Sequence, residues 1–220
     1  MFIPIIIVGF VYFLWTKNFK EIGLATFRMI LQLLIIGYFL SYIFQNQNPM
    51  MGLGILLFMI SVSSFIALRN IKDKNFNTYS KIFISVAIGG SFNLVLVLFF
   101  VLDLDPFYQP RFIIPLAGMI YANSMNALSL GAERFENEIK TGDYISARAI
   151  SFRASLIPQV NAFLAVGLVS LPGMMTGQIL SGVSPIIAVR YQIVVMAMVL
   201  GSAGMSVMIY LYLQGKNRGI

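Results

Sequence analysis

The sequence contains no cysteine and no histidine. Without these side chains it can form no disulfide, no zinc site of the usual Cys/His type and no Cys/His nucleophilic centre. It also lacks the G-x-x-x-x-G-K-[ST] loop that presents backbone amides and a lysine to a triphosphate. These absences exclude most enzyme classes, and they place any hydrolysis of ATP on a different chain.

Charged residues are scarce, at 10% of the 220 residues, whereas 59% are apolar. The mean hydropathy is +0.86, and the apolar residues form runs of about the length that spans a bilayer. The net charge of +7 resides in short loops rather than on one soluble face, so we expect no nucleic-acid partner. The sequence therefore predicts an all-α, polytopic transmembrane helical bundle of about seven spans, forming a single membrane domain over residues 1–220.

The predicted spans cover residues 2–15, 22–44, 50–68, 82–102, 112–130, 154–172 and 185–213. The first is short against the roughly 20 residues that cross a bilayer as a helix. The hairpin between the last two spans either dips into the membrane or lies on its surface. Proline removes one hydrogen bond of the helical ladder, so kinked helices with hinges are predicted at Pro115, Pro158, Pro172 and Gly173.

The basic residues predict the orientation. Residues 17–21, 69–81, 131–153 and 214–220 together hold 12 of the 15 Lys and Arg. The positive-inside rule places these segments and the C-terminus in the cytoplasm and the N-terminus outside.

The long polar segment at 131–153 is predicted to be a short cytoplasmic coupling loop. Its apolar residues recur at helical spacing on both sides of a glycine, which indicates two short amphipathic helices joined by a turn. Such a helix pair can insert into a groove on a partner protein or rest on the bilayer surface, and both alternatives stay open. The coupling candidates are Phe135, Ile139, Gly142 and Ile145.

Several polar side chains lie inside the apolar spans, where they are tolerated if they face protein or a wet cavity. The candidates for a transport path are Arg28, Gln32, Asn123, Asn126, Asn161, Gln178, Arg190 and Gln192. Arg28 can alternatively extend its charge to the inner interface, and Arg190 can brace the outer turn. All eight acidic residues lie in loops or at span ends, so no tight metal site is expected within the membrane.

Small residues recur at three- and four-residue spacing on two spans: Ser85, Gly89 and Gly90 on one, and Ala197, Gly201 and Gly204 on the other. Small side chains let helix backbones approach closely in lipid. We expect them to serve packing, with a homodimer seam along the last span.

Several blocks of sequence resemble one known family. They are RMILQL at 28–33 with GYFL at 37–40, IPLAGMI at 114–120 with NSM at 123–125, LIP at 156–158, and VGLVSLPGMMTG at 166–177. In these blocks the chain resembles the FetB/YbbM-type (UPF0014-like) permeases, the membrane subunits of a bacterial iron-export ABC transporter. The likeness continues through Ser184-Pro185 and Arg190-Tyr191-Gln192.

The resemblance implies a multi-pass permease of the bacterial inner membrane that exports iron or a related metal. ATP and Mg²⁺ would bind a separate ATP-binding ABC subunit, and this chain itself would hold no cofactor. Because an ATPase dimer presents two docking grooves, a homodimer of this chain is expected. The alternatives are an ABC permease for an anionic metabolite such as a nucleotide sugar, an ATP-independent channel and a membrane scaffold.

Overall fold

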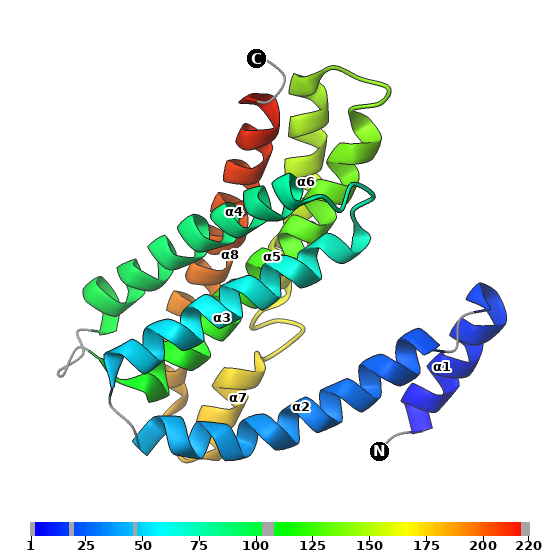
Figure 1. Cartoon of the computed structure of the whole chain (residues 1–220). Coiled ribbons are helices and arrows are strands. Elements are labelled where there is room, and N and C mark those ends of the chain that lie inside the picture. The colour runs from blue at the N-terminus through cyan, green and yellow to red at the C-terminus, as the bar shows by residue number, and fades with distance from the viewer. Residues whose placement is uncertain (1–2, 18–19, 46–47, 103–107, 217–220) are drawn as a thin grey trace. The chain divides into compact units, whose positions relative to one another are not determined.

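The computed structural model of the chain describes residues 3–17, 20–45, 48–102 and 108–216 (Figure 1). The chain forms two compact units, unit 1 (Met1–Gln47) and unit 2 (Asn48–Ile220). Unit 1 contains α1 (Ile3–Thr16) and α2 (Lys20–Gln45). The elements of unit 2 are α3 (Pro49–Ala67), η1 (Leu68–Asn70), α4 (Phe76–Val97), η2 (Leu98–Leu102), α5 (Pro110–Glu138), α6 (Tyr144–Ala165), α7 (Gly173–Leu180) and α8 (Pro185–Lys216).

The prediction of an all-α membrane bundle is confirmed. Within the described residues, five helices are long and apolar enough to cross a membrane: Glu21–Gln45, Pro49–Asn70, Phe76–Leu102, Pro110–Glu138 and Pro185–Gly215. The sequence counted two further segments as spans, and these correspond to α1, a helix of 14 residues, and to α6. A total of seven spans stays a prediction.

In unit 1, Lys17 follows α1 directly and has a φ of 57°. The Tyr12 hydroxyl donates a hydrogen bond of 2.5 Å to the Glu21 carboxylate, which connects α1 to α2. Both Arg28 and Gln32 are exposed on α2. They are four residues apart and therefore lie on the same helix face.

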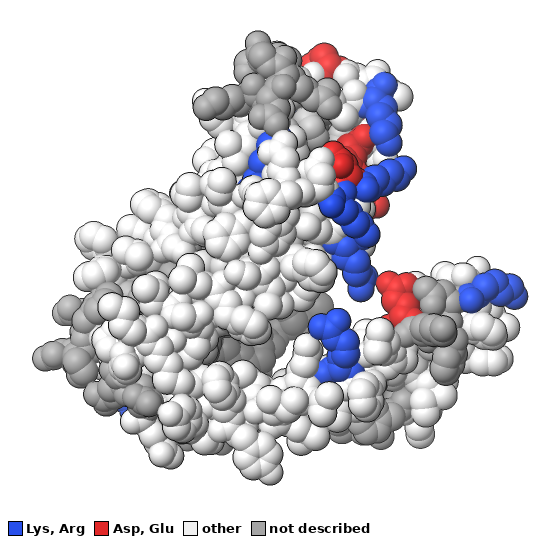
Figure 2. All heavy atoms as spheres, in the orientation of Figure 1, with Lys and Arg blue, Asp and Glu red and all other residues white. Residues whose placement is uncertain are grey.

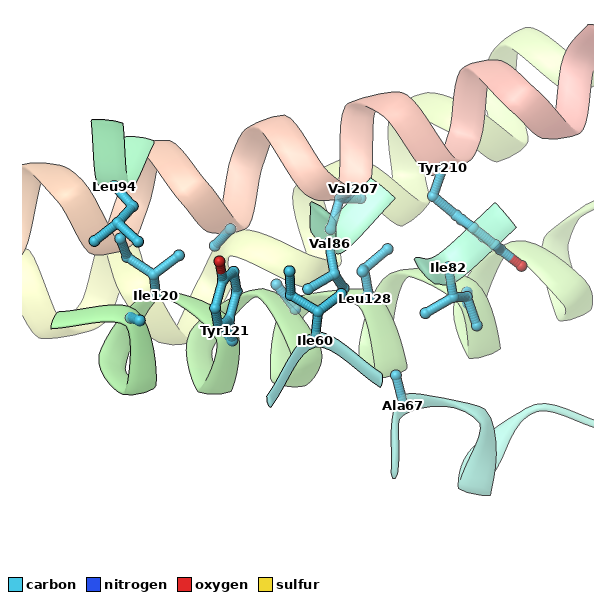
Figure 3. Packing of buried hydrophobic residues seen from close by; sticks show 14 of the residues in the cluster. Ile60, Ala67, Ile82, Val86, Leu94, Ile120, Tyr121, Leu128, Val207 and Tyr210 are labelled. Carbon is cyan, nitrogen blue, oxygen red and sulfur yellow. The ribbon is translucent and has the colours of Figure 1, made fainter. Parts of the chain in front are cut away.

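The core of unit 2 forms where α4, α5 and α8 pack against one another. Helix α3 packs on α4 and α5, α6 packs on α5 and α8, and α7 packs on α8. Figure 3 shows side chains of α4, α5 and α8 filling the space between these helices, among them Ile82, Val86, Leu128 and Val207. The buried positions of α4 recur every three or four residues, as a helix with one packed face requires.

The opposite faces of these helices are also apolar. Phe58, Phe65, Ile88 and Phe92 are at least half exposed. A helix that is apolar all round is suited to lipid rather than to water. Packing in unit 2 therefore relies on small and polar contacts as well as on apolar burial.

The small residues predicted to serve packing lie at helix contacts within the chain. A Cβ atom on Gly89 would lie 2.6 Å from Ser206 Oγ of α8, and one on Gly90 would lie 2.8 Å from the ring of Tyr121. A Cβ atom on Gly201 would lie 2.6 Å from Asn93 Oδ1 of α4. Gly201 therefore packs against its own chain, and the expected dimer seam does not run through this position.

Two predicted boundaries are wrong. The two short amphipathic helices expected within 131–153 are the ends of α5 and α6, which are separated only by residues 139–143. Both helices continue because Phe135 and Tyr144 are buried in the core, with their rings in an edge-on contact at 6.1 Å. The span expected at 154–172 starts at Tyr144 and ends at Ala165, because Val166 is extended and Gly167 has a φ of 80°.

The four predicted hinge residues lie in α5, in α6 and at the start of α7. Pro115 lies inside α5 and Pro158 lies inside α6. Pro172 is the residue before α7, and Gly173 is its first residue. The hairpin between the last two spans is thus a short helix packed against α8. A role for these four residues as hinges stays a prediction.

Candidate transport site

The basic segments of unit 2 meet at one end of the bundle. The backbone N–H groups of Lys72 and Asp73 donate to the Glu136 carboxylate at 3.0 and 3.2 Å. The buried ammonium of Lys81 donates to Gln214 Oε1 at 2.9 Å. Figure 2 shows charged side chains grouped at the end of unit 2 that carries the α5–α6 turn. The segments 69–81 and 131–153 therefore share one end with Gln214, as expected, whereas residues 217–220 of the basic tail lie outside the described residues.

This charged end contains a polar cavity of about 280 Å³. Its lining includes Lys81, Ile139, Tyr210 and Gln214. Gln214 accepts a hydrogen bond from Lys81 and donates one of 2.7 Å to the Tyr210 hydroxyl. This network joins the first turns of α4 to the end of α8. The polar side chains that line the cavity therefore hold these two helices together.

The four coupling candidates divide into an inner and an outer pair. Phe135 is buried, and Ile139 is partly buried against the core. Gly142 is exposed in the turn, where its N–H donates to the Glu138 carbonyl at 3.0 Å. Ile145 is 65% exposed at the start of α6. Gly142 and Ile145 are therefore the members of this set that a partner can reach.

Asp143 fixes the start of α6. Its carboxylate accepts hydrogen bonds of 2.9 Å from both the backbone N–H and the hydroxyl of Ser146. These bonds, the backbone one first, hold the pKa of Asp143 below its usual value of 3.8. The charged cap therefore stabilises α6 fully above the unfolded pKa, and this stabilisation is lost as the pH falls through the lowered folded pKa.

Replacing Asp143 with alanine is expected to speed hydrogen exchange of the Ser146 amide about fivefold at neutral pH, because that amide loses its acceptor. The difference from wild type should shrink as the pH falls below 3.8, the ordinary pKa of the group. Asp143→Asn is the matched control, since it keeps an acceptor without the charge and should retain most of the protection. Equal exchange in wild type and Asp143→Ala at neutral pH would show that the cap does not form.

The transport-path candidates of unit 2 are not gathered into one site. Arg28 and Gln32 belong to unit 1. Asn123 is half-buried on α5 and donates to the Met119 carbonyl of its own helix at 2.8 Å. The exposed candidates of unit 2 are Asn126, Asn161 and Arg190. Gln178 of α7 is partly buried, and Gln192 of α8 is buried.

A second cavity lies between the end of α6, residues 166–171, α7 and α8, with a volume of about 390 Å³. We call it the α6–α8 pocket. Its lining is mostly apolar and includes Phe163, Leu171, Met175, Ile193, Met196 and Gln192. Among the eight candidates, Gln192 is the one that lines this pocket.

The Gln192 amide is the polar feature of the α6–α8 pocket. The side chain is only 6% exposed, and its Oε1 atom is buried without a hydrogen-bond partner in the described structure. Gln159 and Gln178 also carry such an oxygen, but neither lines the pocket. Sequence reasoning missed Phe163, Ile193 and Met196, because an apolar residue in an apolar helix gives no signal of a cavity.

Among the described residues, no three acidic side chains come together in a way that could hold a metal ion. The groups that could contact a cargo in the α6–α8 pocket are the Gln192 amide and the thioethers of Met175 and Met196. An amide offers one donor and one acceptor group, whereas a thioether is a soft and weak acceptor.

The chain is similar to known membrane proteins over most of its length. The family described as "Uncharacterised protein family (UPF0014)" matches residues 1–145 and 143–218. The UPF0014 membrane protein slr1647 of Synechocystis sp. is 36% identical over 189 residues, which cover 79% of this chain and 73% of that protein. No solved structure matches the chain.

Two further relatives carry names that indicate a role. The protein named "Probable iron export permease protein FetB" of Escherichia coli is 35% identical over 210 residues, covering 88% of this chain and 80% of its own. The Protein ALUMINUM SENSITIVE 3 of Arabidopsis thaliana is 33% identical over 202 residues, covering 84% of this chain and 72% of its own.

Proposed function

The chain belongs to the UPF0014 family of membrane proteins, and on this basis we propose that it is the permease subunit of an ABC-type exporter. The cargo is iron or a related metal, moved out of the cytoplasm of a bacterium across its inner membrane. The name of the Escherichia coli relative supports this assignment. ATP and Mg²⁺ bind a separate ATP-binding subunit, because this sequence lacks the phosphate-binding loop.

The observation that carries the proposal is the α5–α6 turn at the charged end of unit 2. Gly142 in the turn (residues 139–143) and Ile145 at the start of α6 are exposed, and the turn connects two helices that continue into the bundle. Helix α5 has 29 residues and is therefore about 43 Å long. A displacement of the turn by a partner is carried along α5 and α6 toward the opposite end, with Pro115 and Pro158 as the flexing points.

The assembly follows from the docking surface. Each subunit offers one α5–α6 turn, and an ATPase dimer presents two equivalent grooves, so the complex contains two copies of this chain. The turn and the C-terminus lie in the cytoplasm, because the charged end holds most of the basic residues of unit 2. The N-terminus lies outside, because the basic segment 17–21 follows the first predicted span.

A second candidate cargo is an anionic metabolite such as a nucleotide sugar. Arg190 is exposed on α8 two residues before Gln192, so a positive charge stands close to the α6–α8 pocket in sequence. Arg28 is likewise exposed on an apolar helix of unit 1. An arginine at membrane depth costs roughly 2.5 to 3.5 kcal/mol on insertion scales, which favours a functional use.

The test is efflux from vesicles that contain the chain together with its ATP-binding subunit. We expect iron(II) to move only with hydrolysable ATP, and Arg28→Gln and Arg190→Gln to leave this movement unchanged. Movement of a nucleotide sugar that is lost in either variant would identify the second candidate. Flux without ATP would indicate a channel, and failure of an ATP-binding subunit to co-purify would indicate a scaffold.

A further inference from the structure

The α6–α8 pocket has the size and lining of a site for an organic molecule. Its volume of about 390 Å³ lies within the usual range of small-molecule sites, roughly 300–1,000 Å³, and far exceeds the size of a bare ion. The pocket opens on the surface of unit 2, because three of its lining residues are also exposed: Phe163, Leu171 and Ile193. A ligand can therefore enter from the side.

Gln192 gives the pocket one polar recognition point. A buried amide without a partner costs free energy, and buried polar groups in proteins are nearly always hydrogen-bonded. The described structure gives Gln192 Oε1 no such bond, and Gln192 is one of the residues that line the pocket. A ligand that places a donor or an acceptor next to this amide removes the cost.

The position of the pocket along α8 identifies the source of the ligand. Its α8 residues run from Val189 to Ala197, which are four to twelve residues into a helix that begins at Pro185. At the rise of an α-helix this is about 6 to 18 Å along the axis. The charged end lies at the other end of α8, around Gln214. The pocket therefore lies in the half of the bundle remote from the charged end, along an apolar helix long enough to cross a membrane.

We propose that the α6–α8 pocket binds a membrane amphiphile with an apolar body and one hydrogen-bonding group of the alcohol or amide type, held at Gln192. A plain acyl chain would fill the volume but would leave the amide unpaired, whereas a hydroxyl, which is both a donor and an acceptor, can pair with it. The inference does not depend on ATP-driven transport, because binding occurs in the permease chain alone.

The experiment is photolabelling of the full chain in lipid nanodiscs with an alkanol that carries a diazirine in its chain. Competitors are decanol and undecane, which have equal numbers of heavy atoms and differ in the hydroxyl, compared at equal mole fraction in the lipid. We expect labelled peptides to contain Met175 or Met196, and decanol to compete roughly two- to tenfold better than undecane, the value of one neutral hydrogen bond.

Three variants test the assignment. Gln192→Leu should remove the preference for decanol while keeping the labelling. Gln159→Leu is the matched control, since Gln159 is equally buried with an unpaired oxygen but lies outside the pocket, and it should keep the preference. Ala197→Phe fills the pocket and should abolish labelling. Equal competition in wild type, a preference that survives Gln192→Leu, or adducts mapped elsewhere would each overturn the proposal.

Discussion

Replacing Gly89 with alanine is expected to lower the free energy of unfolding of unit 2 by about 3 kcal/mol. The added Cβ atom would lie 2.6 Å from Ser206 Oγ, 2.7 Å from the Ser206 backbone nitrogen and 2.9 Å from its Cα atom. A side chain can rotate away from such a contact, but backbone atoms cannot. Helices α4 and α8 must therefore separate, which also strains the 3.1 Å hydrogen bond from Ser206 to Ser124. Reversible denaturation of the protein in mixed detergent micelles measures the effect.

Gly54→Ala is the matched control for this prediction. Gly54 is exposed on α3, and no atom lies within 4 Å of the Cβ position there. Because alanine is the better helix former, this variant should be unchanged or more stable by up to about 1 kcal/mol. If Gly89→Ala were as stable as Gly54→Ala, the close contact between α4 and α8 would not exist in the membrane.

The sequence predicts the helices of this protein well, because apolar runs of bilayer length and basic loops can both be recognised from the local amino-acid composition. The spans at 112–130 and 185–213 lie inside α5 and α8, and the span at 50–68 extends only one residue beyond α3. The sequence also predicts that the basic segments of unit 2 lie at one end of the bundle. These features depend on each segment alone, so no knowledge of its neighbours is needed.

The sequence does not predict which face of each helix is buried. Ile82 is fully buried, whereas Ile84 and Ile88 on the same helix are exposed, although all three are isoleucine. In water the apolar face of a helix is the packed face, but in lipid both faces are apolar. For the same reason the sequence does not predict that α5 and α6 continue through the segment 131–153. The spacing of apolar residues around Phe135 fits a surface helix and a core helix equally.

The candidate site shows a related limit. A polar residue in an apolar helix is visible in the sequence, so the sequence identifies Gln192 as a candidate, although it does not predict the pocket. Asn123 gives the same signal, yet its amide is bonded to the Met119 carbonyl of its own helix. Whether a polar side chain forms a hydrogen bond within its own helix or faces a cavity depends on its rotamer and its neighbours. The spacing of residues in the sequence predicts neither of these.

Replacing Ile145 with glutamate is expected to reduce the stimulation of ATP hydrolysis by the permease at least tenfold. This prediction rests on the docking of the α5–α6 turn in a groove of the ATP-binding subunit. Ile145 is 65% exposed, so the substitution leaves the bundle intact and changes only the outer surface. Loss of a central apolar contact in an interface typically costs 2 kcal/mol or more, and a charge buried there adds to that cost. ATPase activity of the reconstituted complex measures the effect, with thermal stability of the isolated permease recorded beside it.

The control for this experiment is Ile150→Glu. Ile150 is 40% exposed on the same helix, but five residues further on it lies on a different face, between the basic residues Arg148 and Arg153. Loss of coupling in Ile145→Glu with retention in Ile150→Glu would assign docking to the face that continues the turn. Normal coupling in Ile145→Glu would exclude the turn as the docking element and favour the alternative in which it rests on the bilayer. Loss in both variants without loss of stability would mean that the docking surface extends along α6 beyond the turn, because two faces of the helix would then contact the partner.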